Sequence, residues 1–285
     1  MPSALLKTAR NSSPNRTMTA SATPATDPRI AESLSLSLPH GGAAYRVDLH
    51  VPAGEAPVGG WPAMLMLDGE GCFATAVEAL RRMSRRPDAT GTGPMILIGL
   101  SSPDRDPQDR HRERDFGARG AASDFARFVE ADVIAAVAAH ARLDPRRLTL
   151  FGHSLGGYHA LWMLAHRPHL FAAIAAISPS IWWDPEGLRD ALRKASLGDH
   201  RILLCVGEWE EELPPWQAAR QDSDAVRSRR AERQMVARAR DMATLLADRL
   251  DPANVQYRML AEEDHASIIS AAIPRALRLA SAAGR

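Results

Sequence analysis

The sequence predicts an α/β protein with a mostly parallel central sheet, an N-terminal antiparallel hairpin and helices on both faces of the sheet. The first supporting observation is a pair of segments, residues 33–38 and 45–51, that alternate polar and apolar residues on either side of a Pro-His-Gly-Gly turn. Such alternation is typical of a hairpin with one buried face. The second is that the rest of the chain alternates short apolar runs with longer stretches at helical spacing, as strands joined by right-handed crossovers do.

The remaining elements follow this alternation in order. The largely apolar runs expected to form buried strands are residues 63–67, 95–100, 148–151, 172–177, 202–206 and 255–260. The stretches expected to form helices are residues 73–83, 123–141, 155–165, 185–195, 226–250 and 267–280.

Length and composition favour one domain preceded by a tail. A chain of 285 residues can form a single α/β domain. We expect that domain to occupy residues 29–285. Residues 1–28 are rich in Ser, Thr, Ala, Pro and Asn and lack the continuous apolar core of a secretory signal, so we expect them to be disordered. A weak transit-type peptide and translation from Met18 are the alternatives for this segment.

Charge and cysteine content argue against several classes of function. A formal net charge of +1 gives no electrostatic reason to expect nucleic-acid binding. No apolar run approaches the roughly 18 to 20 residues of a membrane span. The two cysteines, Cys72 and Cys205, lie far apart in the sequence and resemble neither a disulfide framework nor a metal cluster. We therefore expect a cytoplasmic protein in a reducing compartment, without metal or cofactor.

A nucleophile motif lies in the middle of the chain. Residues 152–156 read Gly-His-Ser-Leu-Gly and separate a predicted strand from a predicted helix. A serine on such a sharp turn projects its Oγ clear of the backbone, and the glycines let the neighbouring chain pass without Cβ clashes. The simpler alternative is a Gly-rich turn with a bystander serine. Together with the strand order, the motif predicts the α/β-hydrolase fold with Ser154 as nucleophile.

A serine hydroxyl needs a base and an acid, which follow in this fold in the chain order serine, acid, histidine. His265 lies in the loop after the last predicted strand and is the only histidine beyond His200. The acid is expected just after residues 202–206, where four glutamates occur within residues 207–212. A Gly-x-x-acid spacing favours Glu210, and Glu208 and Glu211 are the alternatives.

The tetrahedral oxyanion needs two N–H donors. One is expected from the residue after the nucleophile, Leu155. The other is expected from the Asp-Gly-Glu-Gly loop after residues 63–67, where we assign the Glu70 N–H and hold Gly69 as the second choice. A plain turn is the alternative for this loop.

With these residues in place, the chain resembles the esterase D superfamily of α/β-hydrolases, and within it the enterochelin esterase group, which hydrolyses the lactone esters of iron-loaded catecholate siderophores. The motifs that carry the resemblance are residues 65–70, 152–157, 178–183, 206–210 and 263–267, and they span nearly all of residues 30–282. Family members often carry an Arg-x-x-Asp-aromatic-Thr-Pro segment. Here residues 112–116 are followed by Gly-Ala-Arg-Gly instead, so the substrate-side loop departs from the family pattern.

Two groups of residues bear on the substrate. Arg110, Arg112 and Arg114 lie after residues 95–100, where loops open on the active-site edge of such sheets. Arginines suit anionic, planar oxygen ligands, and Trp182 and Trp183 are suited to stack on catechol rings. The alternatives are arginines paired with neighbouring acids and tryptophans that only pack.

The sequence therefore predicts a serine esterase that acts through an acyl-enzyme on a small-molecule ester, an iron-siderophore chelate by resemblance. The same residues fit a general carboxylesterase or a thioesterase for small acyl or hydroxycinnamoyl substrates. A non-catalytic binding protein with this fold is the alternative of a different class.

Overall fold

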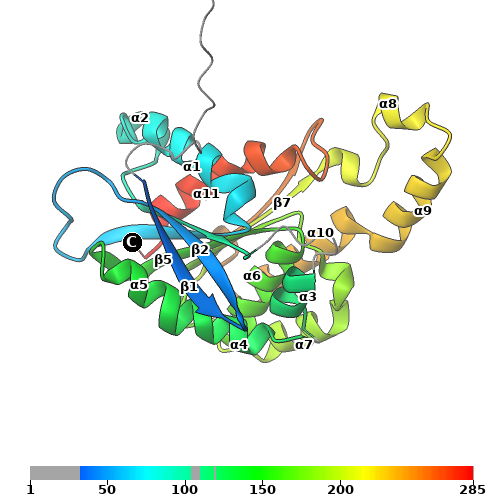
Figure 1. The fold of residues 1–285 in the computed structure, drawn as a ribbon. Helices are drawn as coiled ribbons and strands as arrows, with labels where there is room; N and C mark the ends of the chain where they lie inside the picture. Colours follow the sequence, from blue (N-terminus) through cyan, green and yellow to red (C-terminus); the bar gives the residue numbers. More distant parts are fainter. Residues whose placement is uncertain (1–32, 104–109, 119, 285) are drawn as a thin grey trace, which may run out of the picture. The chain divides into compact units, whose positions relative to one another are not determined.

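The protein is described by a computed structural model for residues 33–103, 110–118 and 120–284. Its centre is an eight-stranded sheet with the order β1-β2-β4-β3-β5-β6-β7-β8 (Figure 1). The strands are β1 (Ser33–His40), β2 (Ala43–His50), β3 (Trp61–Leu67), β4 (Ile96–Ser101), β5 (Leu143–His153), β6 (Ala173–Ile177), β7 (Arg201–Gly207) and β8 (Val255–Leu260). The tail predicted for residues 1–28 lies outside the described residues.

The sheet confirms the predicted combination of an antiparallel hairpin with a parallel run. Strand β2 pairs antiparallel with both β1 and β4. From β4 through β3 and β5 to β8, neighbouring strands pair in parallel. Gly41 and Gly42 close the hairpin with φ values of 59° and 80°. A two-residue hairpin turn with positive φ at both positions favours glycine, which has no Cβ to clash.

Helices cover both faces of the sheet, as predicted (Figure 1). They are α1 (Gly69–Met83), α2 (Pro87–Thr90), α3 (Arg110–Phe116), α4 (Ala122–Phe128), α5 (Ile134–Ala138), α6 (Leu155–His166), α7 (Pro185–Lys194), α8 (Pro215–Ala218), α9 (Ser223–Arg233), α10 (Met235–Ala247) and α11 (Ile268–Ala282). Helices α1, α2 and α11 lie on one face, and α4 to α7 with α10 lie on the other. Within the described residues, no helix is long and apolar enough to cross a membrane.

The helix predicted for residues 226–250 is wrong in one respect, because it is two helices. Gln234, with a φ of 48°, separates α9 from α10, and its N–H donates to the carbonyl of Arg230 at 2.8 Å. Helix α10 buries residues such as Met235 and Val236, whereas α9 buries none. The chain therefore turns where the apolar stripe begins, since only α10 has a face to pack against the sheet.

Two other segments differ from the prediction. A π-helical segment, Val129–Val133, joins α4 to α5, so the helix expected over residues 123–141 is continuous but changes its winding there. The segment after β4, expected as a loop, contains α3. That short helix packs against α6, which follows the predicted nucleophile.

The parallel pairing places the carboxyl ends of β5, β6, β7 and β8 along one edge of the sheet. Loops at this edge of an α/β sheet are where ligands bind. Each of these four strands is followed by a segment that contributes to the site described below.

Candidate active site

Ser154 stands on a tight turn between β5 and α6. Its backbone has a φ of 58° and a ψ of −120°, a conformation that residues other than glycine rarely adopt. The Ser154 N–H donates to the carbonyl of Ile177 at 2.9 Å, which ties the turn to β6. A Cβ on Gly152 would lie 2.1 Å from the carbonyl oxygen of Gly156, so only glycine fits there.

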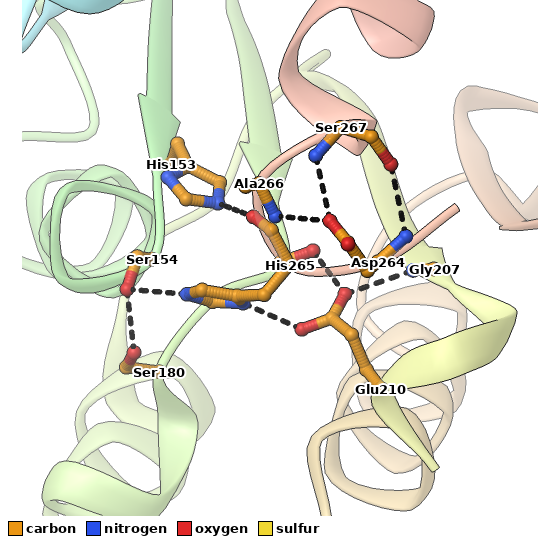
Figure 2. A network of polar contacts seen from close by, with 10 residues as sticks. His153, Ser154, Ser180, Gly207, Glu210, Asp264, His265, Ala266 and Ser267 are labelled. Carbon is orange, nitrogen blue, oxygen red and sulfur yellow. Dashed lines mark hydrogen bonds and ion pairs between the residues drawn. The ribbon is translucent and has the colours of Figure 1, made fainter. Parts of the chain in front are cut away.

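His265 and Glu210 complete a chain of hydrogen bonds with this serine (Figure 2). The Nε2 atom of His265 lies 3.0 Å from Ser154 Oγ, and its Nδ1 atom lies 2.6 Å from Glu210 Oε2. Glu210 follows β7 and is 4% exposed, whereas His265 follows β8 and its side chain is 46% exposed. The structure thus brings together three residues that are more than fifty positions apart in the sequence.

The environment of Glu210 keeps it ionised. Burial alone would raise the pKa of this carboxyl group, but the hydrogen bond and charge of His265, with hydrogen bonds from Ser178 and Gly207, outweigh burial and lower the pKa. An ionised Glu210 accepts the proton on Nδ1 of His265, which leaves the lone pair on Nε2 facing Ser154. The Ser154 hydroxyl then donates to His265.

The other candidate acids are placed differently. Glu208 Oε2 accepts from the backbone N–H of Glu262 at 2.8 Å, so this carboxylate ties the loop after β7 to the turn after β8. Glu211 is exposed. Of the three glutamates, Glu210 is the one that the structure places against His265.

The loop that carries His265 is fixed by its neighbours (Figure 2). Asp264 Oδ1 accepts from the N–H groups of Ala266 and Ser267, each at 2.8 Å, and Ser267 Oγ accepts from the Asp264 N–H at 3.0 Å. On the nucleophile side, His153 Nε2 donates to the His265 carbonyl at 2.7 Å, and the two rings lie 4.6 Å apart. Both contacts restrict where the imidazole can point.

Sequence reasoning did not assign two serines that lie in this network. Both belong to the segment after β6. Ser178 Oγ donates to Glu210 Oε1, and Ser180 Oγ lies 3.2 Å from Ser154 Oγ. Because Ser154 donates to His265, Ser180 is the donor in the second contact. The sequence carried one signal for these serines, which is the strand order. The polar Ser-Pro-Ser segment follows β6, and β6 lies between β5, which precedes the nucleophile, and β7, which precedes the acid.

The residues predicted to form the oxyanion hole lie at two helix starts. Leu155 is the first residue of α6, and Gly69 and Glu70 are the first two of α1. The loop expected after β3 is therefore a helix N-terminus, where the first N–H groups have no intrahelical acceptor. A Cβ on Gly156 would lie 3.2 Å from Asp68 Oδ2, so the start of α1 lies beside the serine turn.

The predicted substrate arginines have partners. Arg112 donates from Nε and Nη2 to the two carboxylate oxygens of Asp68, each at 2.9 Å. Arg114 donates to Asp115 at 2.7 Å and to the Tyr45 hydroxyl at 2.8 Å. Arg110 begins α3, and its side chain lies outside the described residues.

The two predicted tryptophans follow Ser180 directly and differ in their surroundings. Trp183 packs against the main core, and its Nε1 lies 3.2 Å from the position that a Cβ on Gly117 would occupy. Trp182 is half-buried and has the guanidinium of Arg233 over its ring, 4.6 Å from the ring centroid. The role of these arginines and tryptophans in substrate binding stays a prediction.

Two histidines, the buried His159 and the half-buried His153, should make the protein less stable as pH falls from about 6.5 to about 5. Burial lowers the pKa of His153 to about 4 and that of His159 to about 3, from an ordinary value of 6.5. In this range the unfolded chain binds protons at these imidazoles and the folded chain does not. The free energy of unfolding should therefore decrease by up to ~1.4 kcal/mol per pH unit for each histidine. Urea denaturation across the range measures the slope.

The matched variants are His153→Gln and, as a control on the surface, His140→Gln, since the His140 side chain is exposed. The first should flatten the pH dependence and the second should leave it unchanged. An equal slope in wild type and His153→Gln would contradict a neutral His153.

Among the described residues, no three His, Cys, Asp or Glu side chains are grouped so that they could hold a metal ion. The arrangement of Ser154, His265 and Glu210 can instead activate a hydroxyl nucleophile by moving a proton from oxygen to nitrogen. Such chemistry suits acyl transfer from an ester.

Comparisons with known proteins agree with this chemistry. The Esterase family model matches residues 40–244, which is more than half of the chain. The ferri-bacillibactin esterase BesA of Bacillus subtilis is 32% identical over 191 residues, covering 59% of this chain and 66% of BesA. The siderophore enterobactin esterase of Emericella nidulans is 28% identical over 263 residues, covering 80% of this chain and 86% of that protein.

Solved structures share the fold. The BES protein from Bacillus cereus superposes with a TM-score of 0.75 at 23% identity, covering 92% of this chain and 99% of that one. The siderophore hydrolase EstA from Aspergillus nidulans gives a TM-score of 0.76, also at 23% identity, with coverage of 92% and 99%. The family match and the shared fold lead to one conclusion. The chain belongs to the Esterase family of α/β-hydrolases and is a serine hydrolase of carboxylic esters.

Proposed function

We propose that this protein is a siderophore esterase in which Ser154, His265 and Glu210 form the catalytic triad. The observation that carries the mechanism is the hydrogen-bond chain from Glu210 through His265 to Ser154. The substrate class is suggested by relatives named for ferri-bacillibactin and enterobactin. The proposed reaction is hydrolysis of the lactone esters of a ferric catecholate siderophore, which would release iron.

Acylation begins at the serine. Ser154 Oγ attacks the ester carbonyl carbon while His265 Nε2 takes the hydroxyl proton. The ionised Glu210 holds the imidazole through Nδ1 and stabilises the positive charge that develops on it. When the tetrahedral intermediate collapses, the ester C–O bond breaks and His265 gives its proton to the leaving alcohol.

Deacylation repeats these steps with water. His265 removes a proton from a water molecule, whose oxygen attacks the acyl carbon of the Ser154 ester. The free acid leaves and the proton returns to Ser154 Oγ. In both halves, the Leu155 N–H and the Glu70 N–H, with Gly69 as the alternative, are assigned to stabilise the oxyanion.

The proposal also covers the domain that carries the activity and the cell compartment in which it acts. We assign the activity to one domain, residues 29–285, as the sequence predicts. Cys72 and Cys205 are both free and buried, which fits a reducing, cytoplasmic compartment. Arg112, whose guanidinium is bound by Asp68 beside Gly156, places a charged side chain near the serine turn.

The test compares substrates on the purified protein. We expect kcat/KM for a ferric tris-catecholate trilactone to exceed that for p-nitrophenyl acetate by at least about tenfold, because remote binding energy from the chelate contributes to positioning in the transition state. Liquid chromatography follows loss of the trilactone. Triacetylfusarinine C belongs in the panel because another relative, from Aspergillus fumigatus, is named for its hydrolysis. An intact trilactone beside a consumed simple ester would reduce the function to that of a general esterase.

A further inference from the structure

Helix α9 presents a cationic surface made by three of its arginines. Arg227, Arg230 and Arg233 recur every third residue, which places them on neighbouring parts of one helical face. Helix α9 buries no residue, so its side chains are available for contacts other than packing.

The central arginine anchors the helix beside the triad acid. Arg230 Nη1 donates to the Glu212 carbonyl, and its Nη2 donates to Gln217 Oε1 at 2.7 Å. These bonds hold α9 against the segment that leads out of β7. Arg227 and Arg230 also line a cavity of about 440 Å³ together with Glu210 and Glu211. The lining therefore includes the glutamate whose carboxylate contacts His265.

The last arginine connects α9 to the nucleophile side of the site. The Arg233 guanidinium covers the ring of Trp182 at 4.6 Å from the centroid. Trp182 lies two residues after Ser180, whose Oγ is 3.2 Å from Ser154 Oγ. The cationic face thus extends from the acid side of the triad to the nucleophile side.

The outer two arginines also have charge available for a ligand. Arg227 and Arg233 are exposed, and in the part of the chain that the structure describes neither forms an ion pair. The α3 arginines differ, because Arg112 and Arg114 bond Asp68 and Asp115. Among the arginines of α3 and α9 whose side chains the structure describes, those without a carboxylate partner therefore lie on α9.

We propose that Arg227 and Arg233, with Trp182, form the recognition site for the iron-chelated half of the substrate. Catecholate dianions around a ferric ion leave a negative charge spread over planar rings. A guanidinium suits that chemistry, since it donates to oxyanions through a planar fork and stacks on aromatic faces. The proposal rests on the siderophore esterase function and names the surface that distinguishes the ferric chelate from the free ligand.

The first experiment measures binding without turnover. The probe is the ferric complex of a tripodal tris-catecholamide, which has no ester to cleave, and quenching of tryptophan fluorescence gives its Kd. The double variant Arg227→Ala/Arg233→Ala should bind the chelate at least about tenfold more weakly than wild type.

The affinity of the double variant should also depend less on salt concentration, because it lacks the attraction between the two arginines and the chelate, which salt screens. The matched control is Arg82→Ala, which removes an exposed guanidinium from the last turn of α1, the end of that helix away from the triad. It should bind within about twofold of wild type.

The second experiment measures selectivity. The ratio of kcat/KM for the ferric trilactone to kcat/KM for the iron-free trilactone should fall at least about tenfold in the double variant and stay unchanged in Arg82→Ala. Circular dichroism establishes that each variant is folded. If wild type and the double variant bind the chelate equally and keep the same ratio, α9 is not the recognition site, while the esterase function stands. If wild type cleaves neither trilactone, the proposed function itself fails and the recognition proposal with it.

Discussion

Replacing Ser154 with Ala should lower ester turnover by about four to six orders of magnitude, and His265→Ala should lower it by a comparable factor. The members of a triad act as a unit, so removing either leaves only oxyanion stabilisation and substrate binding. Hydrolysis of p-nitrophenyl acetate by the purified variants measures the loss in kcat.

The control for this loss is Ser228→Ala, because Ser228 is an exposed serine on α9. That variant should retain wild-type turnover of p-nitrophenyl acetate. A fluorophosphonate probe should add its mass to the peptide that contains Ser154 in wild type and to no peptide in Ser154→Ala. Near-normal activity in folded Ser154→Ala would overturn the assignment of the nucleophile.

Glu210→Gln should reduce kcat by about four orders of magnitude. A neutral amide at this position can donate to Nδ1 of His265 and so favours the tautomer with its proton on Nε2, which cannot accept from Ser154. It also removes the negative charge that stabilises the imidazolium. The variant should still bind substrate, so kcat rather than KM is the informative parameter.

Glu208→Gln and Glu211→Gln are the matched comparisons, since each changes one carboxylate in the same turn. Both should retain kcat within about threefold. The Glu211 charge is exposed, and a glutamine at position 208 still offers an oxygen to the Glu262 N–H. A severe loss of kcat in Glu208→Gln with normal activity in Glu210→Gln would reverse the assignment of the acid.

The sequence predicted the parts of the site that follow from strand order. Each member of the proposed triad is defined by its local position: Ser154 lies between two glycines, Glu210 lies three residues after Gly207, and His265 lies after β8. Parallel strands bring such positions to one edge of the sheet. The antiparallel hairpin was equally predictable, because alternation and a Gly-Gly turn are local signals.

Features that depend on tertiary contacts were not predictable. The helix break at Gln234 reflects the packing of α10 on the sheet, and nothing in the local sequence requires a left-handed residue there. The contacts of Ser178 and Ser180 depend on β6 lying between β5 and β7. The pairing of Arg112 with Asp68 joins residues 44 positions apart, so charge content alone could not decide which arginines remain available to a ligand.

The serine turn is shaped by main-chain atoms more than by side chains. Gly152 lies against the carbonyl of Gly156, and the N–H of Ser154 bonds a carbonyl of β6. Side chains elsewhere around the cleft can therefore change over evolutionary time without moving the nucleophile. Such tolerance fits the finding that relatives named as siderophore esterases differ from this chain at about seven aligned positions in ten.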